Sequence, residues 1–390
     1  MERTVERRQR FVAGFPTKKA AERARIEALA SASLHGQASA RTTVGDFLAR
    51  DWLPARQPRT AAAGRRHRGQ LGVATWASYS DVIAAYVIPH IGHVRLQDLT
   101  AEHLDRLYDR LEAAGGRRGQ PLSSKTVLNV HRLLHKALKD AVRQQRIAIN
   151  VADRVQPPSA VRTRPSIWRV DQLRAFLRHV ERDRLYAAWL LFATTGMRRG
   201  EVAGLAWADI DLWEATLSVS ITLGVVQAKP TWKPRPKTDA GQRSMSLDPS
   251  TVRALQAHLA AQRAEQALIG SAWPRRLEDW RGQAREDLVF TWPDGTLVHP
   301  ERFTVWFRRH CREAGLPPIR LHDVRHTYAS AGLASAQGWH DVKIISERLG
   351  HTSIGFTLDT YAHVLPVADR QAAATLASVI LDEPSEGAAG

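Results

Sequence analysis

YAAWLLFATTGMRRGE, residues 186–201, joins an apolar run to a charged one. The run from Tyr186 to Thr194 is the longest apolar stretch of the chain, far too short for a membrane span, and predicts a buried helix. Gly196 is the residue type that ends such a helix. A new helix then places Arg198 and Glu201 three residues apart on one face, so the carboxylate can hold the guanidinium. The open alternative is a surface ion pair worth under about 1 kcal/mol.

A second charged cluster, HDVRH at residues 322–326, opens a predicted helix after Pro317-Pro318. His322 and Arg325 lie near its N-terminal end, where unpaired N–H groups and the helix dipole stabilise a phosphate. His326 stands four residues after His322, a spacing that suits a metal. The Glu of a His-Glu-x-x-His motif is absent and no third ligand is evident, so we expect no metal. His326 is then a core histidine or a support for the site.

A third motif is LGH at residues 349–351, with Tyr361 ten residues after His351. Gly350 predicts a helix end, after which Thr352 or Ser353 can cap the next helix. A phenol with a pKa near 10 needs cationic neighbours and a hydrogen-bonding base before it attacks phosphorus. For a single tyrosine, a packing role is the open alternative.

The composition indicates a folded, multidomain protein that binds polyanions. The chain has 390 residues, 44% of them apolar, and a formal net charge of +17 with more Arg than Lys. Arginine suits bidentate phosphate contact, so nucleic acid is the expected partner and a membrane is not. Cys311 is the one cysteine, which excludes an intrachain disulfide and favours an intracellular compartment. We expect a cytoplasmic, nucleoid-associated protein.

Helical periodicity dominates the chain and predicts a mainly α fold with a small antiparallel β-sheet. Apolar residues recur at helical spacing between residues 42 and 153, and alternation at 216–221 and 243–247 predicts the strands. The expected parts are a short basic N-terminal segment (1–40), a helical domain (41–158), a basic linker (159–168), a mixed α+β domain (169–381) and a disordered tail (382–390).

Two stretches are basic and lack acids. The first, residues 55–80, is expected to be a loop, either solvated or in contact with phosphate; the second is the linker. Lys237, before a turn, is a solvated charge or, with a lowered pKa, a proton donor to a departing alkoxide. The candidates for DNA contact are Arg56, Arg59, Arg65, Arg66, Arg68, Arg162, Arg164, Arg199, Lys233 and Arg235.

Together the motifs resemble those of the tyrosine recombinases, the phage integrase family, over almost the whole chain. Thr-Gly-x-Arg-x-x-Glu, His-x-x-Arg, Leu-Gly-His and a late tyrosine stand in the family's order. The resemblance implies a catalytic set that needs neither metal nor ATP. Its members are Arg198 with Glu201 as support, Lys237, His322, Arg325, His351 and the nucleophile Tyr361.

The resemblance also implies a reaction and partners. Tyr361 would form a 3′-phosphotyrosyl link to double-stranded DNA while Lys237 protonates the leaving 5′-oxygen. Residues 42–153 would be the family's core-binding (SAM-like) domain, which clamps DNA with the catalytic domain. Four protomers would assemble through the helix after Tyr361, with an accessory DNA-bending or directionality factor.

Two segments depart from the family pattern. The N-terminal segment resembles only the last strand and helix of an arm-binding domain, and Asn150-Val151 stands where many members have Asn-Pro. Two other functions stay open: a type IB topoisomerase-like nicking-closing enzyme, and a non-catalytic DNA-binding regulator of the same fold. The His-x-x-Arg box and the helical domain favour strand exchange, and the intact catalytic set argues against a regulator.

Overall fold

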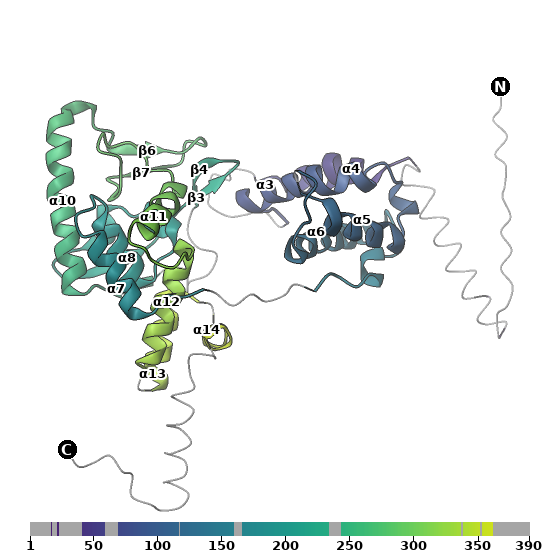
Figure 1. Ribbon diagram of the computed structural model, residues 1–390. Helices are drawn as coiled ribbons and strands as arrows, with labels where there is room; N and C mark the ends of the chain where they lie inside the picture. Colours follow the sequence, from purple (N-terminus) through teal and green to yellow (C-terminus); the bar gives the residue numbers. More distant parts are fainter. Residues whose placement is uncertain are drawn as a thin grey trace, which may run out of the picture. The chain divides into compact units, whose positions relative to one another are not determined.

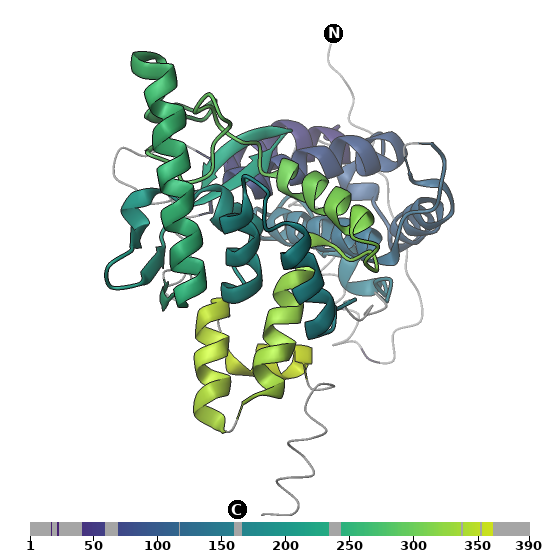
Figure 2. The same cartoon turned by 60° about the vertical axis from the view of Figure 1, so that its left-hand side comes forward.

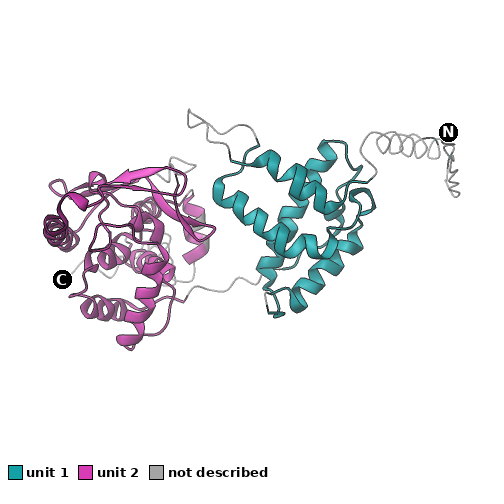
Figure 3. Cartoon of the chain, turned by 90° about the horizontal axis from the view of Figure 1, so that it is seen from above, with its two compact units in different colours: residues 1–163 teal, residues 164–390 magenta. Residues whose placement is uncertain are grey.

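The chain divides into two compact units, residues 1–163 and 164–390 (Figure 3). The computed structural model describes residues 41–58, 69–116, 118–159, 166–233, 243–336, 338–351 and 353–361, with Thr17 and Glu22. The division falls inside the expected linker. Trp168, however, is buried, and its indole N–H donates to the Pro317 carbonyl at 2.9 Å. Packing of the second unit therefore begins before Arg169, earlier than the sequence predicts.

The first unit is helical in its described residues. Its apolar helix faces meet in one core, in which Phe47, Leu104 and Val130 are fully buried. Thr100 and Ser123 cap α5 and α6 with their hydroxyls, as such residues do at helix starts. The elements are α2 (Val44–Asp46), η1 (Phe47–Trp52), η2 (Pro54–Arg56), α3 (Val73–Val82), η3 (Ile83–Val87), α4 (Ile88–Ile91), η4 (Leu96–Asp98), α5 (Ala101–Ala114), α6 (Ser124–Arg143) and η5 (Val151–Arg154).

Two predictions about the basic stretch at residues 55–80 are wrong. Its last part is helical, because α3 begins at Val73. Arg56 is not an exposed loop residue: it is buried, its Nη2 donates to Asp140 Oδ2 at 2.6 Å, and its guanidinium lies 4.6 Å from the centre of the Trp52 ring. This contact was not predictable from neighbouring residues, because Asp140 lies 84 positions further along the chain.

The second unit is built around a buried central helix, α8 (Tyr186–Thr195), which contacts α10 and α12 (Figures 1 and 2). Nearly all of α8 is buried, as its apolar sequence predicts. No described helix is long and apolar enough to cross a membrane. The other helical elements are α7 (Val170–His179), α9 (Arg199–Ala203), η6 (Trp207–Asp209), α10 (Pro249–Ile269), η8 (Gly270–Ala272), α11 (Glu301–Glu313), α12 (Leu321–Ala334), α13 (Trp339–Leu349) and α14 (Ile354–Tyr361).

The described strands of the second unit form three small antiparallel sheets where the sequence predicts one. They are β1 (Ile210–Asp211), β2 (Thr216–Val219), β3 (Thr222–Val226), β4 (Lys229–Lys233), β5 (Arg243–Ser246), β6 (Arg276–Glu278) and β7 (Ala284–Glu286). One sheet has the order β1-β2-β5, and the others are the hairpins β3-β4 and β6-β7. The alternation that begins at Thr216 is interrupted after Val219, so β3 pairs with β4 instead of extending β2. The mainly α fold with small sheets is confirmed.

Candidate active site

Gly196 turns the chain between α8 and α9 as the sequence predicts. Its φ of +64° is left-handed, a conformation that favours glycine. A Cβ at this position would lie 2.7 Å from Tyr328 Cδ1 and 3.0 Å from Leu349 Cδ2. The Tyr328 ring is held in turn, because its hydroxyl accepts a bond of 2.8 Å from Arg348 Nε. Both the left-handed backbone conformation and the lack of room for a Cβ therefore require glycine at position 196.

Gly196→Ala is expected to destabilise the second unit more than Gly315→Ala does. Both glycines have a φ near +63°, but nothing lies within 4 Å of a Cβ at Gly315. Gly315→Ala, the control, should lose only the stability of about 1–2 kcal/mol that a left-handed backbone conformation costs a residue with a Cβ. Gly196→Ala should add at least about 1 kcal/mol of crowding against Tyr328. Urea unfolding of both variants measures the difference, and equal losses would contradict the close packing.

Glu201 lies between two arginines at the start of α9. Its Oε1 accepts from Arg198 Nη1 at 2.8 Å, and its Oε2 accepts from Arg243 Nη2 at 2.7 Å. Glu201 and Arg243 are both buried, whereas the Arg198 side chain is 41% exposed. Burial alone would raise the pKa of Glu201, but hydrogen bonding and charge from Arg243, with the Arg198 charge, lower it to about 2. Glu201 thus supports Arg198, and Arg243 supports Glu201.

Three arginines converge on the C-terminal end of α13, directly before His351. Arg243 Nε donates to the Arg348 carbonyl at 2.6 Å, Arg325 Nη2 to the Leu349 carbonyl, and Arg198 Nη2 to the Gly350 carbonyl at 3.4 Å. A helix C-terminus carries partial negative charge, which stabilises cations there. These contacts bring the motifs at 195–201, 322–325 and 349–351 together.

Arg325 is buried and also ties α12 to the end of α8. Its Nη1 donates to the Gly196 carbonyl at 2.7 Å. Burial and the neighbouring Arg198 charge lower the pKa of Arg325 to about 9, against the opposing effect of Glu201. Of the two predicted catalytic arginines, Arg198 is the exposed one and Arg325 the one held inside.

His322 and His351 stand beside these arginines. Their pKa values are lowered to about 4, mainly by desolvation and further by the charges of Arg325 and Arg198. Both imidazoles are thus neutral at pH 7 in the DNA-free protein. His351 Nδ1 lies 2.7 Å from Thr357 Oγ1 on α14. The His322 ring centre lies 5.2 Å from that of His326, whose charge also lowers the pKa of His322.

Tyr361, the last residue of α14, is only 1% exposed. It packs against Ala329, Leu333 and Leu349, and its hydroxyl lies 2.6 Å from His326 Nδ1. Burial raises the pKa of Tyr361 to about 12, although the Arg325 charge opposes the rise. The hydroxyl is therefore protonated and turned into the protein, and His326, expected only as a core or supporting histidine, is its direct partner.

The Tyr361–His326 contact should be measurable as a coupling energy. His326→Ala and Tyr361→Phe each remove one partner, and the double variant should lose about 1 kcal/mol less than the sum of the single losses, because one hydrogen bond is counted twice. Urea unfolding of the four proteins gives this value. His340→Ala, an exposed histidine on α13, replaces His326→Ala in the control cycle. Additive losses in the first cycle would exclude the bond.

The remaining predicted residues divide into two groups. Arg199 Nη1 donates to Thr304 Oγ1 at 2.8 Å, and Lys233 is exposed at the end of β4. The others lie outside the described residues: Lys237, Arg59, Arg65, Arg66, Arg68, Arg162, Arg164 and Arg235, with the helix expected after Tyr361. Arg243 is the supporting residue that sequence reasoning missed. Its one signal was its place at the start of the predicted strand 243–247.

The second unit thus collects the arginines, histidines and tyrosine of the motifs that resemble those of the tyrosine recombinases. The sequence profile of the phage integrase family matches residues 168–367. The chain belongs to the phage integrase family.

Curated relatives agree with this family. The ICEBs1 integrase of Bacillus subtilis strain 168 is 30% identical over 256 residues, which are 65% of this chain and 65% of that protein. The XerC-like tyrosine recombinase of Caldanaerobacter subterraneus subsp. tengcongensis is 26% identical over 297 residues, 73% of this chain and 72% of that protein. The chain thus spans about two thirds of the length of these relatives.

Solved structures share the fold. The Tn1549 transposon integrase in complex with a circular intermediate DNA has a TM-score of 0.64 and 20% identity, covering 80% of this chain and 96% of that one. A lambda integrase dimer bound to a COC′ core site has a TM-score of 0.54 and 15% identity, covering 88% and 85%.

Proposed function

We propose that this chain is a site-specific DNA recombinase that integrates or excises a phage or other mobile element. The observation that carries the proposal is the meeting of Arg198, Arg243 and Arg325 at the end of α13, beside His351. Two of these arginines come from motifs that, in the family, bind the scissile phosphate. The integrases with this fold that were solved with circular intermediate DNA and with a core site support the same substrate class.

The reaction is a pair of transesterifications. Tyr361 Oη attacks phosphorus, forming a 3′-phosphotyrosyl ester as the bond to the 5′-oxygen breaks, and Lys237 gives that oxygen a proton. A 5′-hydroxyl of a partner strand then attacks the ester and restores Tyr361. Arg198 and Arg325 offset the charge that builds on the non-bridging oxygens, while His322 and His351 bind the phosphate and move protons.

The buried Tyr361 implies a step before cleavage. A hydroxyl that is hydrogen-bonded to His326 and almost wholly covered cannot reach a phosphate outside the protein. Residues 354–361 must therefore move so that the hydroxyl leaves His326. We expect the binding of DNA to Arg198, His322 and His351 to favour that movement, because the phosphate places a negative charge beside these side chains.

The partners follow from the reaction. Exchange of strands between two duplexes needs four cleavages, so we propose a homotetramer on synapsed sites, an accessory DNA-bending or directionality factor, and association with the nucleoid. We propose DNA contacts for Arg199 and Lys233 of the described residues, and for the basic residues at 59–68, 162–164 and 235.

Nicked suicide duplexes carrying attachment-site DNA test the proposal. The full chain should form a covalent adduct on the 3′ side of the break, and a partner duplex with a free 5′-hydroxyl should become joined. Tyr361→Phe should form no adduct while still binding DNA, and Tyr186→Phe, at the other end of α8 from Gly196, is the matched control that should keep the activity.

The outcomes separate the alternatives. An adduct that only reseals its own strand would indicate a topoisomerase-like enzyme, and DNA binding without an adduct would indicate a regulator. An adduct formed by Tyr361→Phe would refute the choice of nucleophile.

A further inference from the structure

A cluster of histidine and carboxylate side chains joins α7 to α11, apart from the residues of the catalytic set. His179 is the last residue of α7, and His310 and Glu313 lie three residues apart on one face of α11. One donor atom from each lies within 4.8 Å of the others, the one such group among the residues that the structure describes.

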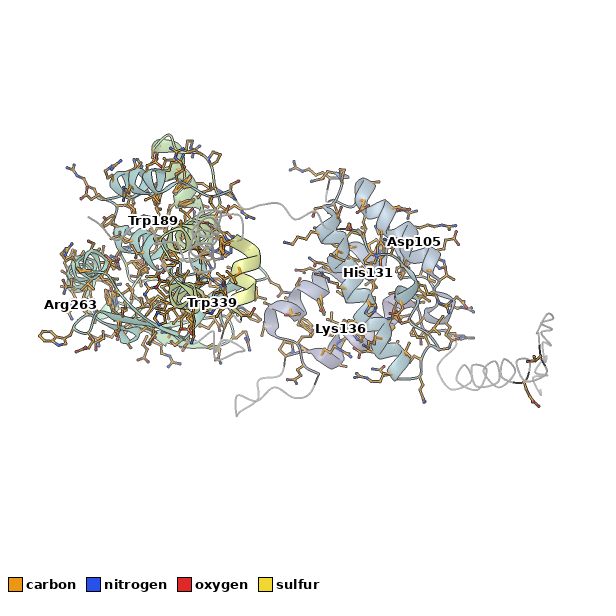
Figure 4. All side chains as sticks on the ribbon, turned by 90° about the horizontal axis from the view of Figure 1, so that it is seen from below. Asp105, His131, Lys136, Trp189, Arg263 and Trp339 are labelled. Carbon is orange, nitrogen blue, oxygen red and sulfur yellow. The ribbon has the colours of Figure 1, made fainter. Side chains whose placement is uncertain are left out.

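The His310 ring is enclosed and makes no hydrogen bond. Its side chain is 8% exposed, and neither ring nitrogen meets the criteria for a hydrogen bond. The ring centre lies 5.7 Å from that of Trp189, which is labelled in Figure 4, and 5.6 Å from that of His179. A buried polar ring without a hydrogen bond is costly, so the surroundings of its nitrogens need an explanation.

Each His310 nitrogen faces a carboxylate oxygen. Nε2 lies 3.3 Å from Asp183 Oδ2, and Nδ1 lies 3.5 Å from Glu313 Oε2. A neutral imidazole carries one N–H and one lone pair. With the N–H toward Asp183, the Nδ1 lone pair of a neutral ring points at an anionic oxygen, an arrangement that a metal ion bound between them would stabilise. The same Glu313 oxygen lies 3.6 Å from His179 Nε2.

These spacings match the edges of a metal coordination sphere. Zinc binds imidazole nitrogen and carboxylate oxygen at about 2.0–2.2 Å, so two ligands of a tetrahedral ion lie about 3.4 Å apart. The two measured separations at Glu313 Oε2, 3.5 and 3.6 Å, are close to this value. His179 is partly exposed, so a small rotation of its side chain can complete the third edge.

Asp183 occupies the place of a residue that orients a metal ligand. A metal-bound histidine usually donates its other N–H to a carboxylate, which fixes the ring and raises its basicity. Asp183 is itself held in place, because its Oδ1 accepts from the Leu185 backbone N–H at 2.8 Å and from Trp189 Nε1 at 3.1 Å. The other oxygen of Asp183, Oδ2, is thus directed at His310.

We propose that His179, His310 and Glu313 form a binding site for one Zn²⁺ ion, which links the end of α7 to the end of α11, with Asp183 orienting His310. Two nitrogens and one carboxylate oxygen are ligands that zinc accepts, and a water completes four-coordination. The site is structural and stands outside the recombination reaction, so it is independent of the proposed function.

Metal titration of the untagged full chain, stripped with a chelator, tests the site. Zn²⁺ should bind with a stoichiometry of one, in competition with a chromophoric chelator. Co²⁺ should give the visible absorption of a tetrahedral ion. Zn²⁺ at a hundredfold excess over its Kd should raise the midpoint of thermal unfolding by about 5 °C.

His179→Ala and Glu313→Gln change exposed side chains and should leave the fold intact. Each should weaken binding at least about 10-fold and abolish the Co²⁺ absorption. His340→Ala, the exposed histidine of α13, is the matched control and should bind as the parent does. If the parent chain binds Zn²⁺ only weakly, the proposed site is refuted. His310 would then be an imidazolium held between Asp183 and Glu313. Unchanged binding by His179→Ala and Glu313→Gln would overturn the site as well.

Discussion

Glu201→Gln is expected to destabilise the second unit by about 3–5 kcal/mol and to slow DNA cleavage at least about 100-fold. Glu201 and Arg243 are both buried, so removal of the carboxylate charge leaves a guanidinium without its counterion. Arg198 loses the partner that fixes it, and a small displacement of a phosphate-binding group is enough to cost two orders of magnitude in rate.

The loss should depend on pH. The pKa of Glu201 is lowered from 4.5 to about 2 in the folded chain, so its contribution to stability is present above pH 4.5 and is lost as pH falls toward 2. The shift corresponds to about 3 kcal/mol. Urea unfolding at several pH values should therefore show the parent and Glu201→Gln converging in acid.

An exposed glutamate supplies the control for this prediction. Glu214→Gln, between β1 and β2, should change neither stability nor cleavage. A Glu201→Gln protein whose unfolding midpoint equals that of the parent at pH 7 would mean that Arg243 finds another partner. In that case Glu201 would not be the support of Arg198.

Arg325→Lys is expected to lower the rate of adduct formation by about 10²–10³-fold and to cost about 2–4 kcal/mol of stability. Arg325 donates to the carbonyls of Gly196 and Leu349 from two nitrogens of one planar group. A lysine has a single nitrogen and cannot reproduce this fork, so a buried carbonyl loses its partner. The position of cationic charge at the proposed phosphate site changes as well.

Single-turnover cleavage of a suicide duplex and urea unfolding measure the two effects separately. Arg253→Lys, at an exposed arginine of α10, should leave both unchanged. If Arg325→Lys unfolds earlier but cleaves at the parental rate once folded, Arg325 has a structural role only. Such a result would reassign phosphate binding to Arg198 and the histidines.

Local features of the fold were predictable because neighbours along the chain determine them. The apolar run before Gly196 and the glycines that end α8 and α13 depend on residues within a few positions. The sheets were predicted less well, since strand pairing joins residues that are far apart, such as Thr216 and Ser246. The prediction of a loop at residues 55–80 was wrong at Arg56 for the same reason, because the partner of Arg56, Asp140, lies on another helix.

The sequence by itself determined the candidates for the chemistry, since Arg198, His322, Arg325, His351 and Tyr361 each stand in a short motif. The tertiary structure alone decided what surrounds them. Arg243 is hydrogen-bonded to Glu201, and His326 to the Tyr361 hydroxyl. These pairs are 42 and 35 positions apart in the sequence. The pairing of His179 with His310 spans a still longer stretch of chain. Such contacts form because folding buries charged and polar groups, which must then find partners wherever the packing of helices brings them.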